Sequence, residues 1–208
     1  MKKQIILAVL GILFLARLSF AQLHTIQVAD GAIHQYTLAE TSGTTAFDAG
    51  SSPSNGTYNG GFTLNQMPPI SVDLAGNVLL DGISGHVDLG FTDPPANGGT
   101  GAWTVEFVFN PQSATRGDRI ISNDHTDSSV AGFQILSIDS TLFADVGFTG
   151  GDAAIGQALY FVPGKTYICQ LIYTGTTDNH ILFYVNNVLL GSAATTGTYV
   201  GAGFHTSV

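Results

Sequence analysis

Cysteines, basic residues and glutamates are few in this sequence, and these shortages limit the bonds and partners that the chain can have. A single cysteine among 208 residues rules out an intrachain disulfide. Six lysines and arginines stand against 15 acidic residues, which argues against nucleic acid and anionic membranes as partners. Only two of the acids are glutamates, Glu40 and Glu106. Because no intrachain disulfide is possible, the chain must fold on its hydrophobic core alone, which a chain of this length can do.

Motifs of catalysis and nucleotide binding are absent from the sequence. It contains no Gly-x-Ser-x-Gly elbow for a nucleophilic serine and no Walker loop. None of the six histidines stands in His-Glu-x-x-His or in another zinc-ligand spacing. The sequence therefore favours a protein that binds over an enzyme.

Residues 1–21 have the parts of a secretory signal peptide. Two lysines precede the apolar run Ile5–Leu15, and Ser19-Phe20-Ala21 places small residues before a cleavage point. The run is shorter than the roughly 20 residues of a spanning helix. An uncleaved anchor is the alternative. We expect cleavage before Gln22 and a secreted or cell-surface bacterial protein. Its single domain, residues 22–208, keeps three basic against 15 acidic residues, a net charge of −12.

The strongest strand pattern covers Lys165–Leu190. Residues of both alternating phases from Tyr167 to Thr174 are largely apolar, which predicts a strand in mid-sheet with both faces covered. Asn186-Asn187 between apolar runs predicts a two-residue type I′ hairpin, because asparagine tolerates positive φ. Cys169 lies in this pattern, so we expect a buried and unreactive thiol.

Other segments also have strand patterns, and none has a helical period of useful length. In Ala102–Asn110, alternate residues starting at Trp103 share one apolar face and Glu106 lies on the other. Glu40–Gly61 is rich in turn residues and predicts an ordered excursion across the fold. Shorter strands are expected at Val78–Leu80, His86–Leu89, Arg119–Ser122, Phe133–Ile138, Leu142–Phe148 and Ala158–Phe161. Together with 26 glycines, these patterns predict an all-β fold, a two-sheet antiparallel sandwich.

Five short motifs occur in order between Tyr36 and Leu190. They are Tyr36–Thr45 with Asp48 and Asn55-Gly56-Thr57, Leu80-Asp81-Gly82 with Val87-Asp88-Leu89, Trp103–Phe107 with Pro111, Pro163-Gly164-Lys165, and the Tyr-Val-Asn-Asn hairpin. In this order they resemble bacterial laminin-G-like domains, and the second half also resembles pentraxins. Both families belong to the concanavalin A-like jelly rolls, so the resemblance implies a jelly-roll sandwich.

The same resemblance implies features beyond the fold. Members of both families continue past the equivalent of Val208 with a last strand that pairs close to the N-terminal strand. We therefore expect a C-terminally truncated domain that lacks its last strand or strands, with further domains of the same polypeptide as partners; a short natural variant is the alternative. Cys169 and Glu106 fall where pentraxins place their disulfide. No bridge is possible here, but the resemblance implies that the two side chains are neighbours.

Calcium is the cofactor that the sequence favours most. In the pentraxin-like register Asp127 falls near a loop ligand, with Asp124 and Asn123 beside it. Asp48 with Asn55 is a second candidate site for calcium. Carboxylate and amide oxygens suit this ion, although such loops also serve merely as solvated turns.

These observations predict a secreted, non-catalytic recognition or adhesion module whose partner is a glycan or a surface protein. The first alternative is a structural spacer module of a larger cell-surface protein or glycoside hydrolase. The second is a glucanase-type hydrolase with Glu106 as the candidate acid. Hydrolysis of glycosides takes two carboxylates, and the Glu-x-Asp-x-x-Glu strand of the related jelly-roll glucanases is absent from this sequence.

Overall fold

The computed structural model describes residues 31–67, 76–92, 100–113, 118–123, 131–138, 141–159, 161–201 and 206–208. Within these residues the chain forms strands and no helix, so no described segment could cross a membrane as a helix. The first strands are β1 (Thr45–Ala46), β2 (Gly56–Asn59), β3 (Phe62–Gln66), β4 (Asn77–Leu80), β5 (His86–Asp88) and β6 (Trp103–Phe109). The remaining ones are β7 (Asp118–Ser122), β8 (Phe133–Ile138), β9 (Thr141–Val146), β10 (Ala153–Ala158), β11 (Tyr167–Tyr173), β12 (His180–Val185) and β13 (Val188–Ala194).

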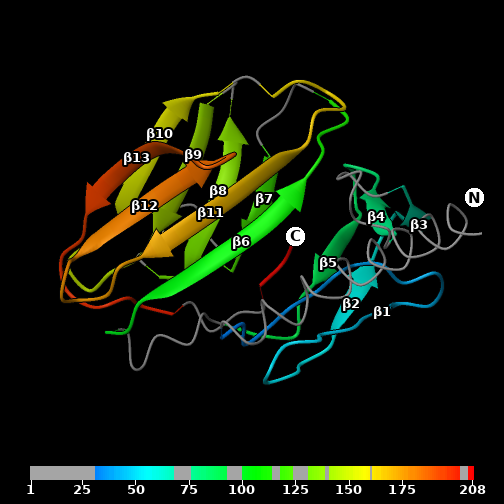
Figure 1. The fold of residues 1–208 in the computed structure, drawn as a ribbon, viewed down its shortest axis with the longest axis horizontal. Helices are drawn as coiled ribbons and strands as arrows, with labels where there is room; N and C mark the ends of the chain where they lie inside the picture. The colour runs from blue at the N-terminus through cyan, green and yellow to red at the C-terminus, as the bar shows by residue number, and fades with distance from the viewer. Residues whose placement is uncertain are drawn as a thin grey trace, which may run out of the picture.

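Two antiparallel sheets of four strands face each other and form the larger part of the molecule. The front sheet has the order β13-β12-β11-β6, and the back sheet has the order β10-β9-β8-β7. Figure 1 shows the front sheet nearest the viewer with the back sheet behind it. The structure thus confirms the predicted all-β antiparallel sandwich.

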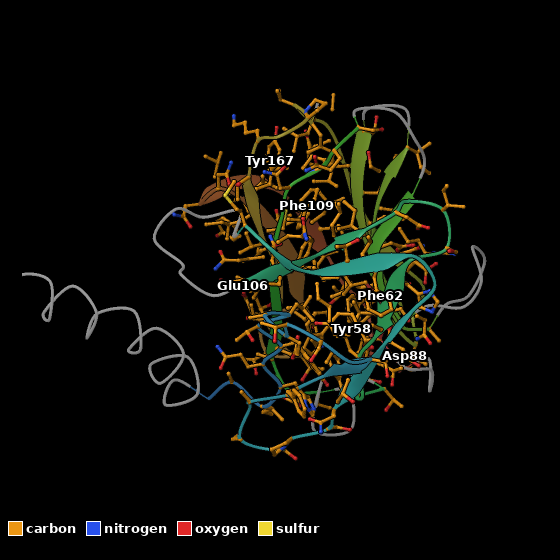
Figure 2. The ribbon with its side chains drawn as sticks, turned by 90° about the vertical axis from the view of Figure 1, so that its right-hand side faces the viewer. Tyr58, Phe62, Asp88, Glu106, Phe109 and Tyr167 are labelled. Atoms are coloured by element: carbon orange, nitrogen blue, oxygen red, sulfur yellow. The ribbon has the colours of Figure 1, made fainter. Side chains whose placement is uncertain are left out.

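The first half of the chain extends this sandwich at one side. Strands β1, β2 and β5 form a three-stranded sheet, and β3 pairs with β4 in a separate hairpin. The hairpin covers a second, smaller core of Ala46, Tyr58, Val87 and Leu89. The ring of Tyr58 stacks on that of Phe62 with centroids 5.2 Å apart; both are labelled in Figure 2.

Residues 206–208 join the two parts of the molecule. On one side the N–H of Val87 donates to the carbonyl of Val208 at 2.8 Å, and the N–H of Leu89 donates to that of Thr206 at 2.7 Å. On the other side Ser207 and Ser122 exchange two backbone hydrogen bonds of 2.8 and 2.9 Å. The segment therefore lies between β5 and β7 and makes one continuous layer of the back sheet and the β1-β2-β5 sheet.

The resemblance places a further strand beyond Val208, close to the N-terminal strand, and that expectation stays a prediction. Residues 206–208 themselves pair with both β5 and β7. The side chain of Val208 also packs against both cores. The C-terminal trace runs between the two parts in Figure 1.

The main core lies between the front and back sheets. Inward residues of β11 and β12, among them Leu171, Tyr173 and Phe183, have no exposed surface. They meet Phe133, Ile135 and other inward residues of the back sheet. Burial of such a side chain stabilises a fold by roughly 1.5–3 kcal/mol. The predicted inward face of β6 is confirmed, since Trp103 is buried and packs in this core.

The structure confirms some of the predicted segments and corrects others. The type I′ hairpin is confirmed, because Asn186 and Asn187 have φ angles of 51° and 63°. The expected strand at Ala158–Phe161 is wrong; the strand is β10, at Ala153–Ala158. Strand β11 lies in mid-sheet as predicted, but only one of its faces is buried, and its other face is half-exposed. Glu40–Gly61 is ordered as expected and includes β1 and β2.

The pairing of residues 206–208 predicts the effect of a proline at Ser207. Ser207→Pro removes the N–H that donates to Ser122 and places proline inside a sheet, where it is poorly tolerated. We expect the free energy of unfolding, measured with urea, to fall by about 1–3 kcal/mol or more. Ser207→Ala keeps the backbone donor and is the matched control. Equal stability of the two variants would contradict the closing role of this segment.

The position of Cys169 predicts an unreactive thiol. Its side chain has no exposed surface, and burial raises the pKa of the thiol to about 12. The thiolate is the reactive form, so a thiol reagent such as DTNB should label the folded chain only as fast as it unfolds. Because the chain has one cysteine, the colour change reports this site alone. Rapid labelling of the native protein at pH 8 would contradict the burial.

Candidate functional site

The predicted calcium loop falls only partly on the described residues. Asp124 and Asp127 lie outside them, so calcium binding there stays a prediction. Asn123 is buried, and its side-chain amide makes hydrogen bonds to other protein groups. Its oxygen accepts from the N–H of Phe133 at 2.7 Å, and its amide nitrogen donates to the carbonyl of Thr92 at 2.7 Å. Asn123 thus anchors the end of β7 to two neighbouring segments. Among the described residues, no group of three or more His, Cys, Asp or Glu side chains gathers as a metal site would require.

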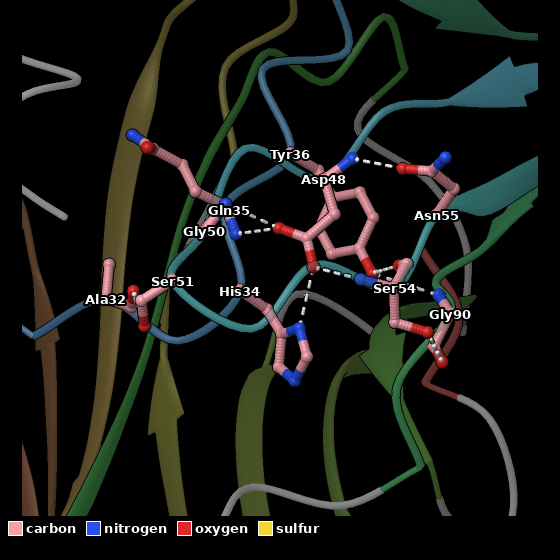
Figure 3. A network of polar contacts seen from close by, with 10 residues as sticks. All are labelled: Ala32, His34, Gln35, Tyr36, Asp48, Gly50, Ser51, Ser54, Asn55 and Gly90. Carbon is pink, nitrogen blue, oxygen red and sulfur yellow. Dashed lines mark hydrogen bonds and ion pairs between the residues drawn. The ribbon is translucent and has the colours of Figure 1, made fainter.

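The structure does bring together Asp48 and Asn55, the second predicted pair (Figure 3). The oxygen of Asn55 accepts from the N–H of Asp48 at 3.0 Å. One carboxylate oxygen of Asp48 accepts from the N–H groups of Gln35 and Gly50, at 2.7 and 2.8 Å. The other accepts from the N–H of Ser54 at 2.9 Å and faces Nδ1 of His34 at 2.7 Å.

This arrangement occupies the carboxylate of Asp48. Burial acts to raise its pKa, but hydrogen bonds from Gln35, His34, Ser54 and Gly50 outweigh burial and hold the pKa below its ordinary value. A carboxylate offers about four lone-pair positions, and four donors surround this one. Calcium binding by Asp48 and Asn55 stays a prediction, while the observed contacts give Asp48 a structural task.

The structural task of Asp48 and its neighbours is to hold three segments of the first half of the chain together. The hydroxyl of Tyr36 donates to the carbonyl of Ser54 and accepts from the N–H of Gly90 at 3.0 Å. Burial, reinforced by the charge of Asp48, raises the pKa of Tyr36 to about 12. The ring of His34 stacks on Phe91 with centroids 4.7 Å apart. The network therefore holds residues 34–36, 48–55 and 90–91 in one rigid unit.

A different kind of site lies on the outer face of the front sheet, the face turned away from the back sheet. In the register of the strands, Gln170 on β11 stands opposite Glu106 on β6 and opposite Tyr184 on β12. The amide of Gln170 donates to Glu106 Oε2 at 2.5 Å. Leu189 on β13 stands opposite Tyr184 and ends the row. We call these four residues the outer row; Glu106 is labelled in Figure 2.

Apolar side chains surround the outer row. Ile168 and Ile172 lie on either side of Gln170 along β11 and are half-exposed. Val108 is 39% exposed, and Leu189, the apolar member of the row, is 48% exposed. In the sequence, this face corresponds to the second set of alternating residues in β11 and β12. Only the strand register shows that Glu106, Gln170 and Tyr184 lie side by side. The outer row therefore combines a carboxylate, an amide and an aromatic ring on one accessible surface.

The outer row does not support a glycosidase. Glu106 is the only acidic residue on the four strands of the front sheet, all of which the structure describes. Hydrolysis needs a second carboxylate about 5–10 Å away. The implied proximity of Glu106 and Cys169 is also wrong, because Glu106 points outward and Cys169 is buried in the core opposite Phe107.

Comparisons with solved structures support the same type of fold. No protein-family model and no curated protein sequence matches the chain. The binding domain of Paraclostridial Mosquitocidal Protein 1 superposes with a TM-score of 0.65 at 10% identity, over 87% of this chain and 44% of that one. The botulinum neurotoxin DC binding domain in complex with SialylT gives a TM-score of 0.55 at 13% identity, over 84% and 42%. The botulinum neurotoxin DC binding domain in complex with rat synaptotagmin II gives 0.55 at 15% identity, over 86% and 44%.

These likenesses establish the β-sandwich fold of the chain, which spans less than half the length of each neighbour. The neighbours are described as binding domains. They do not single out the laminin-G-like or concanavalin A-like families.

The contacts of Asp48 predict a pH-dependent stability. At pH 7, Asp48→Asn turns an amide donor toward N–H groups and should lower the free energy of unfolding by about 1–3 kcal/mol. Because the pKa of Asp48 is lower in the folded chain, its contribution is present above the ordinary value of about 3.9 and is lost as the pH falls further. Urea unfolding from pH 7 to pH 2 should show the difference between wild type and variant shrinking below about pH 4.

A matched control is Asp178→Asn, which makes the same change in an exposed turn and should alter stability by less than about 0.5 kcal/mol. A difference between wild type and Asp48→Asn that stays constant down to pH 2 would contradict the role given to this carboxylate.

Proposed function

We propose that this chain is a secreted, non-catalytic recognition module of the laminin-G-like type, within the concanavalin A-like jelly rolls, and that it binds glycans on the outer row. The single observation that carries the proposal is the juxtaposition of Glu106, Gln170 and Tyr184 on the exposed face of three paired strands. Export rests on the signal pattern of residues 1–21.

The chemistry of the outer row suits a sugar. A pyranose ring has apolar C–H faces and a rim of hydroxyl groups. The ring of Tyr184 offers a flat apolar surface with a polar tip. Gln170 can donate and accept, whereas the carboxylate of Glu106 accepts strongly from hydroxyl groups. Their mutual hydrogen bond holds both side chains in place, which lowers the entropy lost on binding.

The comparisons support a partner of this class. One solved neighbour is a binding domain in complex with SialylT, and another is described by an interaction with two ganglioside molecules. A third is in complex with a protein, rat synaptotagmin II. Glycans and surface proteins are therefore the partners that we propose for this chain. Calcium held by Asp127 with Asp124 is a further element of the proposal; the side chain of Asn123 is engaged by Phe133 and Thr92.

A spacer module is the second candidate function. The observation that favours it is the exposure of Val108 beside the outer row and of Leu189 at its end, which suits packing against another domain of the same polypeptide. The greater length of the solved neighbours is in line with further domains. A spacer would bind no glycan, so the experiment below separates the two functions.

The test is binding of the protein to a glycan array, followed by calorimetric titration with the glycans retained. Tyr184→Ala should weaken binding about tenfold or more, equivalent to about 1.4 kcal/mol, because it removes the stacking ring. Tyr184→Phe keeps the ring and should retain most of the affinity, and Glu106→Gln should weaken binding with no loss of folding. Binding that is unchanged in Tyr184→Ala would place the site elsewhere, and the absence of binders would favour the spacer.

A further inference from the structure

We infer that the outer row selects neutral oligosaccharides that lie across the strands, in preference to acidic or single sugars. This inference rests on the proposed function and names the class of glycan. Two observations carry it: the distribution of charge on the front sheet and the extent of the row over four strands.

The charge on the front sheet has one sign. Its strands contain no lysine or arginine, and Glu106 is their only acidic residue. Recognition of a carboxylate or sulfate group in proteins relies on arginine or lysine. Here such a group would meet the carboxylate of Glu106 with no lysine or arginine on the same strands to balance it. An acidic sugar is therefore repelled at the position where a neutral sugar donates a hydroxyl hydrogen bond.

The basic residues that the structure describes lie elsewhere. Arg119 is on β7 of the back sheet, where its Nε donates to Gln134 at 3.1 Å. Lys165 precedes β11, and its ammonium nitrogen lies 5.6 Å from the centroid of the Tyr167 ring, whose side chain is buried. The overall charge of the chain, with 15 acids against six basic residues, adds to the repulsion of anions.

The length of the outer row sets the size of the ligand. Its members come from β6, β11, β12 and β13 in spatial order, so Glu106 and Leu189 are separated by three strand spacings. Each spacing is about 4.8 Å, which gives the row a length of about 14 Å. This exceeds one pyranose ring. A single sugar contacts the tyrosine or the carboxylate, whereas a chain of linked sugars running perpendicular to the strands contacts both.

The experiment uses an array in which each neutral tetrasaccharide is paired with its uronic acid or sialylated counterpart and with its monosaccharide. We expect the wild-type protein to bind neutral tetrasaccharides at least tenfold more tightly than either of the other two. Glu106→Lys should reverse the charge preference and gain binding to the acidic members. Glu106→Gln should reduce the preference for neutral over acidic glycans without reversing it. Asp178→Asn, which also removes one negative charge but lies in a turn, should leave the preference unchanged.

The outcomes separate this inference from the proposed function. Equal or tighter binding of acidic glycans by the wild type would overturn the selection by charge, although the module would still bind glycans. Equal binding of mono- and tetrasaccharides would overturn the extended geometry. Failure of every glycan to bind would overturn the proposed function itself. Thermal unfolding of each variant shows whether a lost signal reflects a lost fold, and Glu106→Gln tests the charge argument if Glu106→Lys does not fold.

Discussion

The register of β11 between β6 and β12 is the constraint on which the rest of the structure depends. It sets one phase of the three strands against the back sheet, so that Leu171, Tyr173 and Phe183 form the centre of the core. The same register sets the other phase outward and aligns Glu106, Gln170 and Tyr184. A shift of β11 by one residue would exchange its two faces and would bury the amide of Gln170 while exposing Leu171. The packing of the core and the alignment of the outer row are thus fixed by one set of backbone hydrogen bonds.

The first half of the chain is attached to this sandwich by contacts that are distant in sequence. Residues 206–208 pair with β5 and β7, and the Asp48 network ties the segments around β1 and β2 together. Neither feature touches the outer row. The molecule therefore separates two tasks: buried polar contacts hold irregular segments in place at one side, while the regular front sheet offers an accessible face.

Alternation in the sequence was enough to predict the strands with β-branched and aromatic residues, the inward face of β6 and the asparagine hairpin, but not that only one face of β11 is buried. Strand β10 was misplaced because alanine, glycine and glutamine carry no strand preference and gain their place from pairing with β9. The pairing of Val208 with Val87 spans most of the chain, and no local pattern signals such a contact. The outer row was hidden for the same reason: Glu106 and Gln170 are 64 residues apart, and only the register brings them together.

The central claim is that recognition takes place on the outer face of the front sheet. The most direct test is an NMR titration of the isotopically labelled protein with a neutral oligosaccharide retained on the array. The account predicts that the largest shift changes fall on the side-chain amide of Gln170, the ring of Tyr184 and the backbone of β6, β11 and β12. Shift changes confined to the back sheet or to the segments around Asp48, with the outer row unaffected, would contradict it.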